Sequence, residues 1–142
     1  MESRKRILGL DVGDKRIGVA VSDELGKIAL PVQTIQRTSA PKDFRVISEI
    51  ADQYEATSIV VGLPIRLDGT SSPQTEKVRE FIKQLKRHVP IPVVSWDERL
   101  TTTTAEASLI EADVSRKARR KIIDSVAAQI MLQHFLDCSS SP

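Results

Sequence analysis

The first third of the chain is patterned as short apolar stretches separated by polar turns, which predicts β-strands. The stretches lie at about residues 7–12, 17–22 and 28–35. The turns between them are short, so we expect the three strands to pair as antiparallel hairpins. Pro31 lacks the backbone N–H that a central strand would use, and the third strand is therefore predicted at an edge of the sheet.

Further along the chain, apolar residues recur three and four positions apart, which predicts amphipathic helices. Ser39-Ala40-Pro41 opens the first of these helices, because proline is favoured in a first helical turn. Its predicted apolar face consists of Phe44, Ile47, Ile50, Ala51 and Tyr54. A second helix is predicted from the apolar residues Val78, Phe81, Ile82 and Leu85. Short buried strands are expected at residues 58–61 and 91–96.

The last part of the chain is predicted to be helical. Thr101 to Thr104 can cap a helix over residues 105–112. A final helix, from about Arg116 to Asp137, is expected to bury the apolar residues Ile122, Val126, Ile130, Leu132 and Phe135. The order βββαβαβαα predicts an α/β fold in one domain, residues 1–142, with parallel strands added to an antiparallel start.

One carboxylate stands out in this pattern. Asp11 lies inside the first strand, among residues that should be buried, and a buried carboxylate is costly unless it is paired or binds a metal. Sites in such sheets gather at the carboxyl ends of the parallel strands. Glu98 lies just beyond the fifth strand, and Asp124 lies on the last helix. These two residues are the candidate partners of Asp11.

Composition narrows the class of protein. The chain has 142 residues, of which 40% are apolar and 28% charged, as in soluble globular proteins. No apolar run approaches the roughly 20 residues that span a bilayer, and the one behind the basic start is too short for a signal peptide. Cys138 is the only cysteine, so no internal disulfide can form, which favours a cytoplasmic location.

Positive charge is concentrated in one basic block, which comprises Arg116, Lys117, Arg119, Arg120 and Lys121. The net charge of the whole chain is only +2, so the rest of the chain is mildly acidic. Taken alone, such a block favours a solvated helix face, with a footprint for a polyanion as the alternative.

Four motifs then support a resemblance. They are Leu10-Asp11-Val12-Gly13 with residues 16–23, Val60-Val61-Gly62-Leu63-Pro64 with Asp68-Gly69, residues 97–102, and residues 123–128. In this order they resemble the YqgF/RuvX family of ribonuclease H-like nucleases. The resemblance implies a five-stranded mixed sheet in the order 3-2-1-4-5, flanked by helices. It also implies a relation to Holliday-junction resolvases and to 5′-end maturation of precursor 16S ribosomal RNA. The chain departs from the family at Arg66-Leu67, where Asn-Met is usual.

The resemblance further implies a metal-dependent nuclease whose catalytic residues and metal ligands are Asp11, Glu98 and Asp124. Mg²⁺ or Mn²⁺ fits these oxygen ligands, and two such ions about 3.5–4 Å apart can neutralise a phosphate and deprotonate water. Asp11 is predicted to bridge both ions, with Glu98 and Asp124 holding one each. We expect the basic block and Arg16 to bind the substrate.

Alternatives exist for each residue. Asp11 could accept hydrogen bonds from its own turn, Glu98 could cap a helix, and Asp124 could pair with Lys121. The other aspartates of the motifs are predicted to be turn residues, with Asp68 as a reserve ligand; they are Asp14, Asp23, Asp68 and Asp97. Trp96 is predicted to belong to the core.

The expected partner is nucleic acid, with a ribosomal RNA precursor favoured over branched DNA. We expect no association with a membrane, and either a monomer or a homodimer. The alternative functions are a Holliday-junction DNA resolvase, a catalytically silent RNA-binding module and, less favoured, one lobe of an actin-like ATPase.

Overall fold

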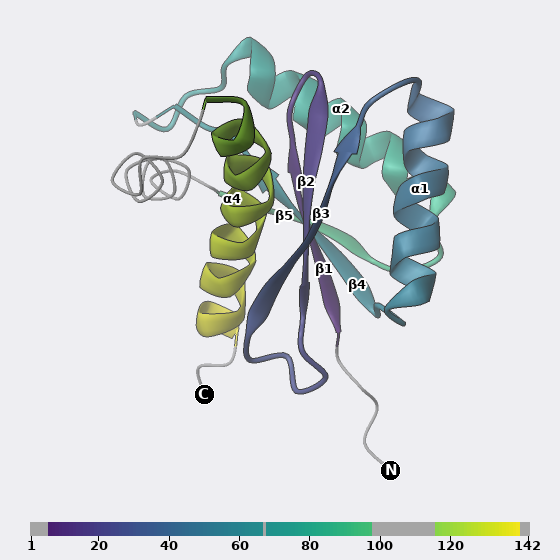
Figure 1. Cartoon of the computed structure of the whole chain (residues 1–142). Coiled ribbons are helices and arrows are strands. Elements are labelled where there is room, and N and C mark those ends of the chain that lie inside the picture. Colours follow the sequence, from purple (N-terminus) through teal and green to yellow (C-terminus); the bar gives the residue numbers. More distant parts are fainter. Residues whose placement is uncertain (1–5, 67, 98–115, 140–142) are drawn as a thin grey trace.

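A computed structural model of the chain describes residues 6–66, 68–97 and 116–139, with side chains from Ser125 to Cys138 in the last segment (Figure 1). Five strands form one sheet. They are β1 (Ile7–Val12), β2 (Arg16–Ser22), β3 (Ala29–Gln36), β4 (Ser58–Leu63) and β5 (Val93–Asp97). The helices described with them are α1 (Ala40–Gln53), α2 (Pro73–His88) and α4 (Arg116–Ser139).

The strand order is β3-β2-β1-β4-β5, which confirms the predicted topology with β1 in the centre. The pairs β1–β2 and β2–β3 are antiparallel, whereas β4 runs parallel to β1 and to β5. β3 lies at an edge, as Pro31 predicted. The carboxyl ends of β1, β4 and β5 therefore share one end of the sheet. We call it the upper end, because it lies at the top of Figure 1.

Helices cover both faces of the sheet. α1 and α2 lie on one face and α4 lies on the other (Figure 1). Successive side chains of a strand point to opposite faces, so β1 serves both layers. Leu8, Leu10 and Val12 belong to the core under α1 and α2. Ile7, Gly9 and Asp11 alternate with them and lie on the α4 face.

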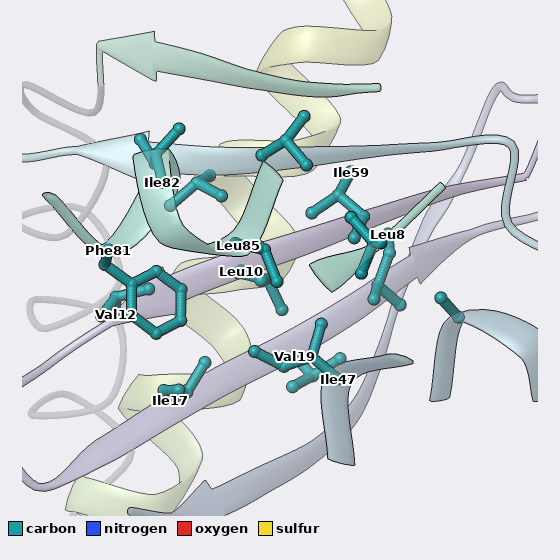
Figure 2. Packing of buried hydrophobic residues seen from close by; sticks show 14 of the residues in the cluster. Leu8, Leu10, Val12, Ile17, Val19, Ile47, Ile59, Phe81, Ile82 and Leu85 are labelled. Atoms are coloured by element: carbon teal, nitrogen blue, oxygen red, sulfur yellow. The ribbon is translucent and has the colours of Figure 1, made fainter. Parts of the chain in front are cut away.

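The core under α1 and α2 is built from large side chains that interdigitate (Figure 2). Leu8, Leu10 and Ile17 from the sheet are fully buried, and so are Ile47 of α1 and Leu85 of α2. Burying one such side chain stabilises the fold by about 1.5–3 kcal/mol. This layer contains the predicted apolar faces of the first two helices, and it supplies most of the hydrophobic stabilisation.

The buried cluster under α4 has fewer residues, and its members from the strands are alanines. It consists of Ala20, Ala29, Ala128, Leu132 and Leu136. Gly9 lets the helix approach the sheet closely, because a Cβ atom added there would lie 3.0 Å from the Cβ of Leu132. The contact is therefore close between backbones but modest in apolar area.

Two glutamines fasten α4 to the edge of the sheet. The Oε1 atom of Gln133 accepts the Ala29 N–H at 2.8 Å, and Gln129 Nε2 donates to the Ala29 carbonyl at 3.1 Å. Gln133 Nε2 also donates to the Lys27 carbonyl at 2.8 Å. These bonds use backbone groups at the start of an edge strand, and they fix the position of α4 along its own axis.

β1 has the predicted bounds, and the boundaries of the other elements differ from the predicted ones by one to a few residues. β3 is shifted by one residue, β4 continues to Leu63, and β5 begins at Val93 and continues to Asp97. α1 begins after Ser39, as predicted. The predicted cap at Thr101 to Thr104 and the helix over residues 105–112 lie outside the described residues.

The predicted buried face of the last helix is partly wrong. Val126 and Ile130 are only half-buried, whereas Ala127, Ala128 and Met131 are buried. Leu132 is buried as predicted, Phe135 is half-buried, and the side chain of Ile122 is outside the described set. The face turned to the sheet carries Ala128, Leu132 and Leu136, and Leu132 packs directly against Gly9.

None of the helices in the described segments is both long enough and apolar enough to cross a membrane.

Candidate active site

Asp11 lies near the carboxyl end of β1 on the α4 face. Its side chain is half-buried, so the prediction of a buried carboxylate was wrong in degree. The neighbouring Leu10 and Val12 point to the opposite face and are buried there. Asp11 itself lies at the upper end of the layer between the sheet and α4, where it is only partly covered.

The strands on either side of Asp11 contribute glycines to its row. Asp11 pairs with Gly18 of β2, and one step beyond the Leu10–Val61 pair lies Gly62 of β4. Gly62 in turn pairs with Trp96 of β5. A residue directly across a strand pair is the closest side-chain neighbour on a sheet. The positions directly across from Asp11 on both adjacent strands are therefore glycines.

Trp96 closes this row on the β5 side. Its ring packs edge-to-face against Phe135 of α4, with the ring centroids 5.5 Å apart. Trp96 was predicted to belong to the core, but it is only half-buried, and the prediction was wrong in degree. The pair places the even-numbered positions of β5 on the same face as Asp11.

The end of β5 lies at the upper end of the sheet together with Asp11 (Figure 1). Asp97 is the last residue of β5, and the prediction that it is a turn residue was wrong. It pairs with Leu63, whose side chain belongs to the core under α1 and α2, so Asp97 is in register with the face opposite Asp11. Glu98 follows in sequence and lies outside the described residues.

The amino-terminal half of α4 lies at the same end. α4 runs antiparallel to β1, and its first turns are at the top of Figure 1. Asp124 is four residues before Ala128 and eight before Leu132, which are buried against the sheet. The backbone of Asp124 therefore continues the row of helix positions that faces the sheet, one turn closer to the upper end. Its side chain is outside the described set.

The basic block and Arg16 are brought to this end as well. Arg116, Lys117, Arg119, Arg120 and Lys121 form the first turns of α4. Arg16 begins β2 on the α4 face, two residues before Gly18. Diagonal neighbours of this kind are about 7–8 Å apart, so Arg16 and Asp11 are near each other on one face.

Three aspartates that the sequence assigned to turns are indeed held in turns. Asp14 forms an exposed ion pair with Lys77 at 3.5 Å. Asp23 accepts hydrogen bonds from the backbone of Lys27 and Ile28. In the loop between β4 and α2, the hydroxyl and the N–H of Thr70 donate to Asp68, and these bonds lower the pKa of its carboxyl group. Asp68 is thus engaged within its own loop, which weakens its case as a reserve ligand.

The donor set of the predicted site suits a hard divalent cation. Asp11, Glu98 and Asp124 offer carboxylate oxygens only, which is the ligand type that Mg²⁺ and Mn²⁺ prefer. Within the described segments, no three acidic, histidine or cysteine side chains are clustered closely enough to form a metal site. That search includes Asp11, whereas Glu98 and the side chain of Asp124 lie beyond it.

Comparison with known proteins assigns the family. Residues 5–138 match RuvX, whose description is Holliday junction resolvase. The chain belongs to the RuvX family. The match covers every motif that carried the resemblance in the sequence, from the strand with Asp11 to the helix with Asp124.

Curated relatives are similar over nearly their whole length. A protein of Thermoanaerobacter pseudethanolicus is 52% identical over 133 residues, which are 93% of this chain and 96% of the relative. A protein of Clostridium botulinum is 50% identical over 135 residues, or 95% of this chain and 98% of the relative. Both are named as candidate pre-16S rRNA nucleases.

Solved structures share the fold at low sequence identity. T. thermophilus RuvC in complex with a Holliday junction substrate has a TM-score of 0.56 and 13% identity, with 95% of each chain covered. The fowlpox virus resolvase with Holliday junction DNA has a TM-score of 0.57 and 13% identity, over 96% of this chain and 99% of the other. The fold of this RuvX chain is thus the ribonuclease H-like fold.

Sequence reasoning missed two charged residues of this RuvX chain. Arg37 lies between β3 and α1, and Asp43 lies in the first turn of α1 with only 2% of its surface exposed. They form an ion pair at 3.3 Å. A signal was present in the sequence, because Asp43 is four residues before Ile47 and so falls on the apolar face of its helix. A charged residue at such a position needs a partner.

Proposed function

We propose that this chain is a nuclease that requires a divalent metal ion and cleaves the precursor of 16S ribosomal RNA. One observation carries the proposal. Asp11 lies in a row flanked by glycines, at the end of the sheet where β5 ends and where α4 brings in Asp124 and the basic block. A phosphodiester needs carboxylates for metal ions and cations for its neighbouring phosphates, and these residue types meet at the upper end.

Asp11, Glu98 and Asp124 would hold the metal, with Mg²⁺ or Mn²⁺ as the ion. When bound, the metal supplies neutralisation of the phosphate charge and a deprotonated water at neutral pH. Asp11 contributes a half-buried carboxylate on a rigid central strand, so its oxygens are held in one place. Gly18 and Gly62 leave the positions beside it free of side chains from the neighbouring strands.

The basic block and Arg16 would hold the nucleic acid backbone. Lysine and arginine contacts to phosphates position a substrate without reading its sequence. Arg16 lies on the face of Asp11, and the basic block begins the helix that carries Asp124. Substrate phosphates bound by both would lie at the upper end of the sheet, near Asp11. The location would be cytoplasmic, because ribosomal RNA precursors are processed where ribosomes are assembled.

RNA is favoured as the substrate because the relatives with about half of their residues identical are named for pre-16S rRNA. A DNA junction resolvase is the second candidate. It is favoured by the description of the family and by the shared fold of two resolvases bound to junction DNA. A symmetric junction would call for a homodimer, whereas a single RNA end requires only one active site.

A comparison of matched substrates tests the assignment. The protein is incubated with a 5′-extended 16S precursor RNA and with a four-way DNA junction, each with Mg²⁺ and with a chelator. We expect RNA cleavage that depends on Mg²⁺ and weak or no cleavage of the junction. Faster cleavage of the junction would establish the resolvase instead. Tight binding of RNA without cleavage under any metal condition would leave the silent RNA-binding module.

A further inference from the structure

The turn that follows β1 is held from outside the sheet by one arginine. Arg37 Nη1 donates a hydrogen bond to the carbonyl oxygen of Gly13 at 2.8 Å. The backbone N–H of Arg37 donates to the Lys15 carbonyl at 2.9 Å. Within the turn, the Gly13 N–H donates to the Arg16 carbonyl at 2.8 Å. Arg37 therefore binds the segment that connects Asp11 to Arg16 at two points.

The guanidinium group is itself fixed by both helices of the large core. Its Nε atom donates to Asp43 of α1 at 3.3 Å, and its central carbon lies 5.3 Å from the centroid of the Phe81 ring of α2. The second oxygen of Asp43 accepts the Thr38 N–H at 3.1 Å. The Asp43 side chain is only 3% exposed, whereas that of Arg37 is 26% exposed.

Through these contacts Arg37 connects the core under α1 and α2 to the turn between β1 and β2. On the core side, Phe81 also packs on Phe44, with the ring centroids 5.1 Å apart. On the turn side, Arg37 contacts the carbonyl of Gly13, which is two residues beyond Asp11. A planar guanidinium with several donors can satisfy Asp43 and Gly13 at once, and a lysine ammonium lacks this fork geometry.

We propose that Arg37 is a positioning residue for the active site, which holds the Gly13–Arg16 turn and thereby fixes Asp11 and Arg16 relative to each other. This inference rests on the proposed nuclease function. Arg37 does not touch the reacting atoms; it acts through the backbone of the turn. An error of about 1 Å in the position of a catalytic group can reduce a rate by about 100-fold, so a loosened turn should be visible in catalysis.

The test compares Arg37→Lys with the wild type and with Arg79→Lys. Arg79 is a matched control, because it forms an ion pair with Glu76 on α2 at 2.7 Å and is not among the residues that hold the turn. For Arg37→Lys we expect kcat to fall about 10- to 100-fold while KM changes less than about 3-fold. For Arg79→Lys we expect both constants to stay at the wild-type values.

Amide hydrogen exchange gives a readout that does not depend on activity. Arg37→Lys should speed exchange of the hydrogen-bonded Gly13 amide, while the amides of the central strand pair, such as Val19, stay protected. A variant that is merely less stable would instead lose protection throughout the sheet. Asp43→Asn provides a second variant, because the amide can still accept the Thr38 N–H but loses the charge that holds Arg37.

The outcomes separate this inference from the function on which it rests. A wild-type protein that cleaves neither RNA nor the DNA junction would contradict the nuclease assignment before any variant is compared. An active wild type with unchanged kcat and unchanged Gly13 exchange in both Arg37→Lys and Asp43→Asn would overturn the positioning role alone. A fall in kcat with faster exchange confined to the turn supports it.

Discussion

The two faces of the sheet differ in the size of the side chains that the strands present. Under α1 and α2 the strands present leucine, isoleucine and valine, which form one continuous buried cluster. Under α4 the same strands present Gly9, Gly18, Ala20 and Gly62, with Asp11 among them. Neighbouring residues of one strand, Leu10 and Asp11, thus belong to layers with different tasks.

The difference indicates that the layer under α1 and α2 contributes most of the stability, whereas the layer under α4 has room for the proposed active site. Large apolar side chains are most effective when they are fully covered, and the layer of Leu10 is covered by two helices. A site for metal ions and phosphate needs room and charged groups, both of which weaken a core. In the layer of Asp11, the neighbouring strand positions carry small residues, and α4 is held by close packing at Gly9 and by hydrogen bonds from its glutamines.

The largest effect is expected on catalysis, from a change of Asp11 in the layer under α4. Asp11→Asn removes the charge that a metal ion requires, so it should remove about 4 kcal/mol of transition-state stabilisation, or about a thousandfold in rate. Thermal stability should stay equal or rise, because one charge is removed from the proposed group of three carboxylates. Cleavage assays and thermal unfolding of the same preparation check both halves. Full activity of the purified variant would remove the nuclease site from Asp11.

A change of the neighbouring Leu10, in the core under α1 and α2, should have the opposite effect: a loss of stability with little loss of activity. Leu10 is fully buried, and Leu10→Ala should lower the free energy of unfolding by about 2–5 kcal/mol through lost burial and a cavity. Activity per folded molecule should remain close to that of the wild type at low temperature. Urea denaturation of Leu10→Ala beside Asp11→Asn is the measurement. If both variants lost similar stability, the division between the layers would not hold.

A smaller effect is expected where α4 approaches the sheet. Gly9→Ala places a Cβ atom 3.0 Å from Leu132, which should cost about 1–3 kcal/mol of stability through overpacking. Leu132→Ala removes the Cδ2 and Cγ atoms, which would lie 3.3 and 3.4 Å from the added Cβ atom, and leaves only the Cβ contact. The double variant should therefore be less destabilised than the sum of the two single variants. The expected coupling is about 0.5–3 kcal/mol, measured in a double-mutant cycle of unfolding free energies. Strict additivity would mean that this contact does not set the packing of α4.

The smallest effect concerns the basic block. Changing Arg119 and Arg120 to Ala should leave stability unchanged and weaken binding of different RNA sequences about equally. On single-stranded RNA, log affinity falls with log salt by about 0.7 per phosphate contact, so the slope should flatten by about one to two units. Affinity measured over a series of salt concentrations checks this. An unchanged slope would identify the block as a solvated helix face.

The sequence predicted most of the framework, because local patterns determine it. Alternating apolar residues located β1 and β2, Pro31 located the edge strand, and helical spacing located α1 and α2. The glycine and proline motifs carried the family resemblance, which supplied the strand order. Single-domain organisation and the oligomeric state stay predictions.

Other features could not be predicted from local patterns, because they depend on tertiary contacts. The face of α4 with Ala128, Leu132 and Leu136 packs on Gly9 and Ala20 of distant strands, so Val126 and Ile130 are turned partly outward. Asp11 is less buried than its strand suggests, because it lies at an open end of the layer. Asp43 was missed because its partner Arg37 lies outside its helix. The roles of Glu98 and Asp124 rest on the sequence.

Metal binding to Asp11 is the central claim, and calorimetric titration of Mn²⁺ into the nucleotide-free protein tests it most directly. We predict that the wild type binds Mn²⁺ without any added nucleotide and that Asp11→Asn, folded and equally stable, has lost this binding. Equal Mn²⁺ affinity in the two proteins, or binding that appears only when ATP is added, would contradict the account.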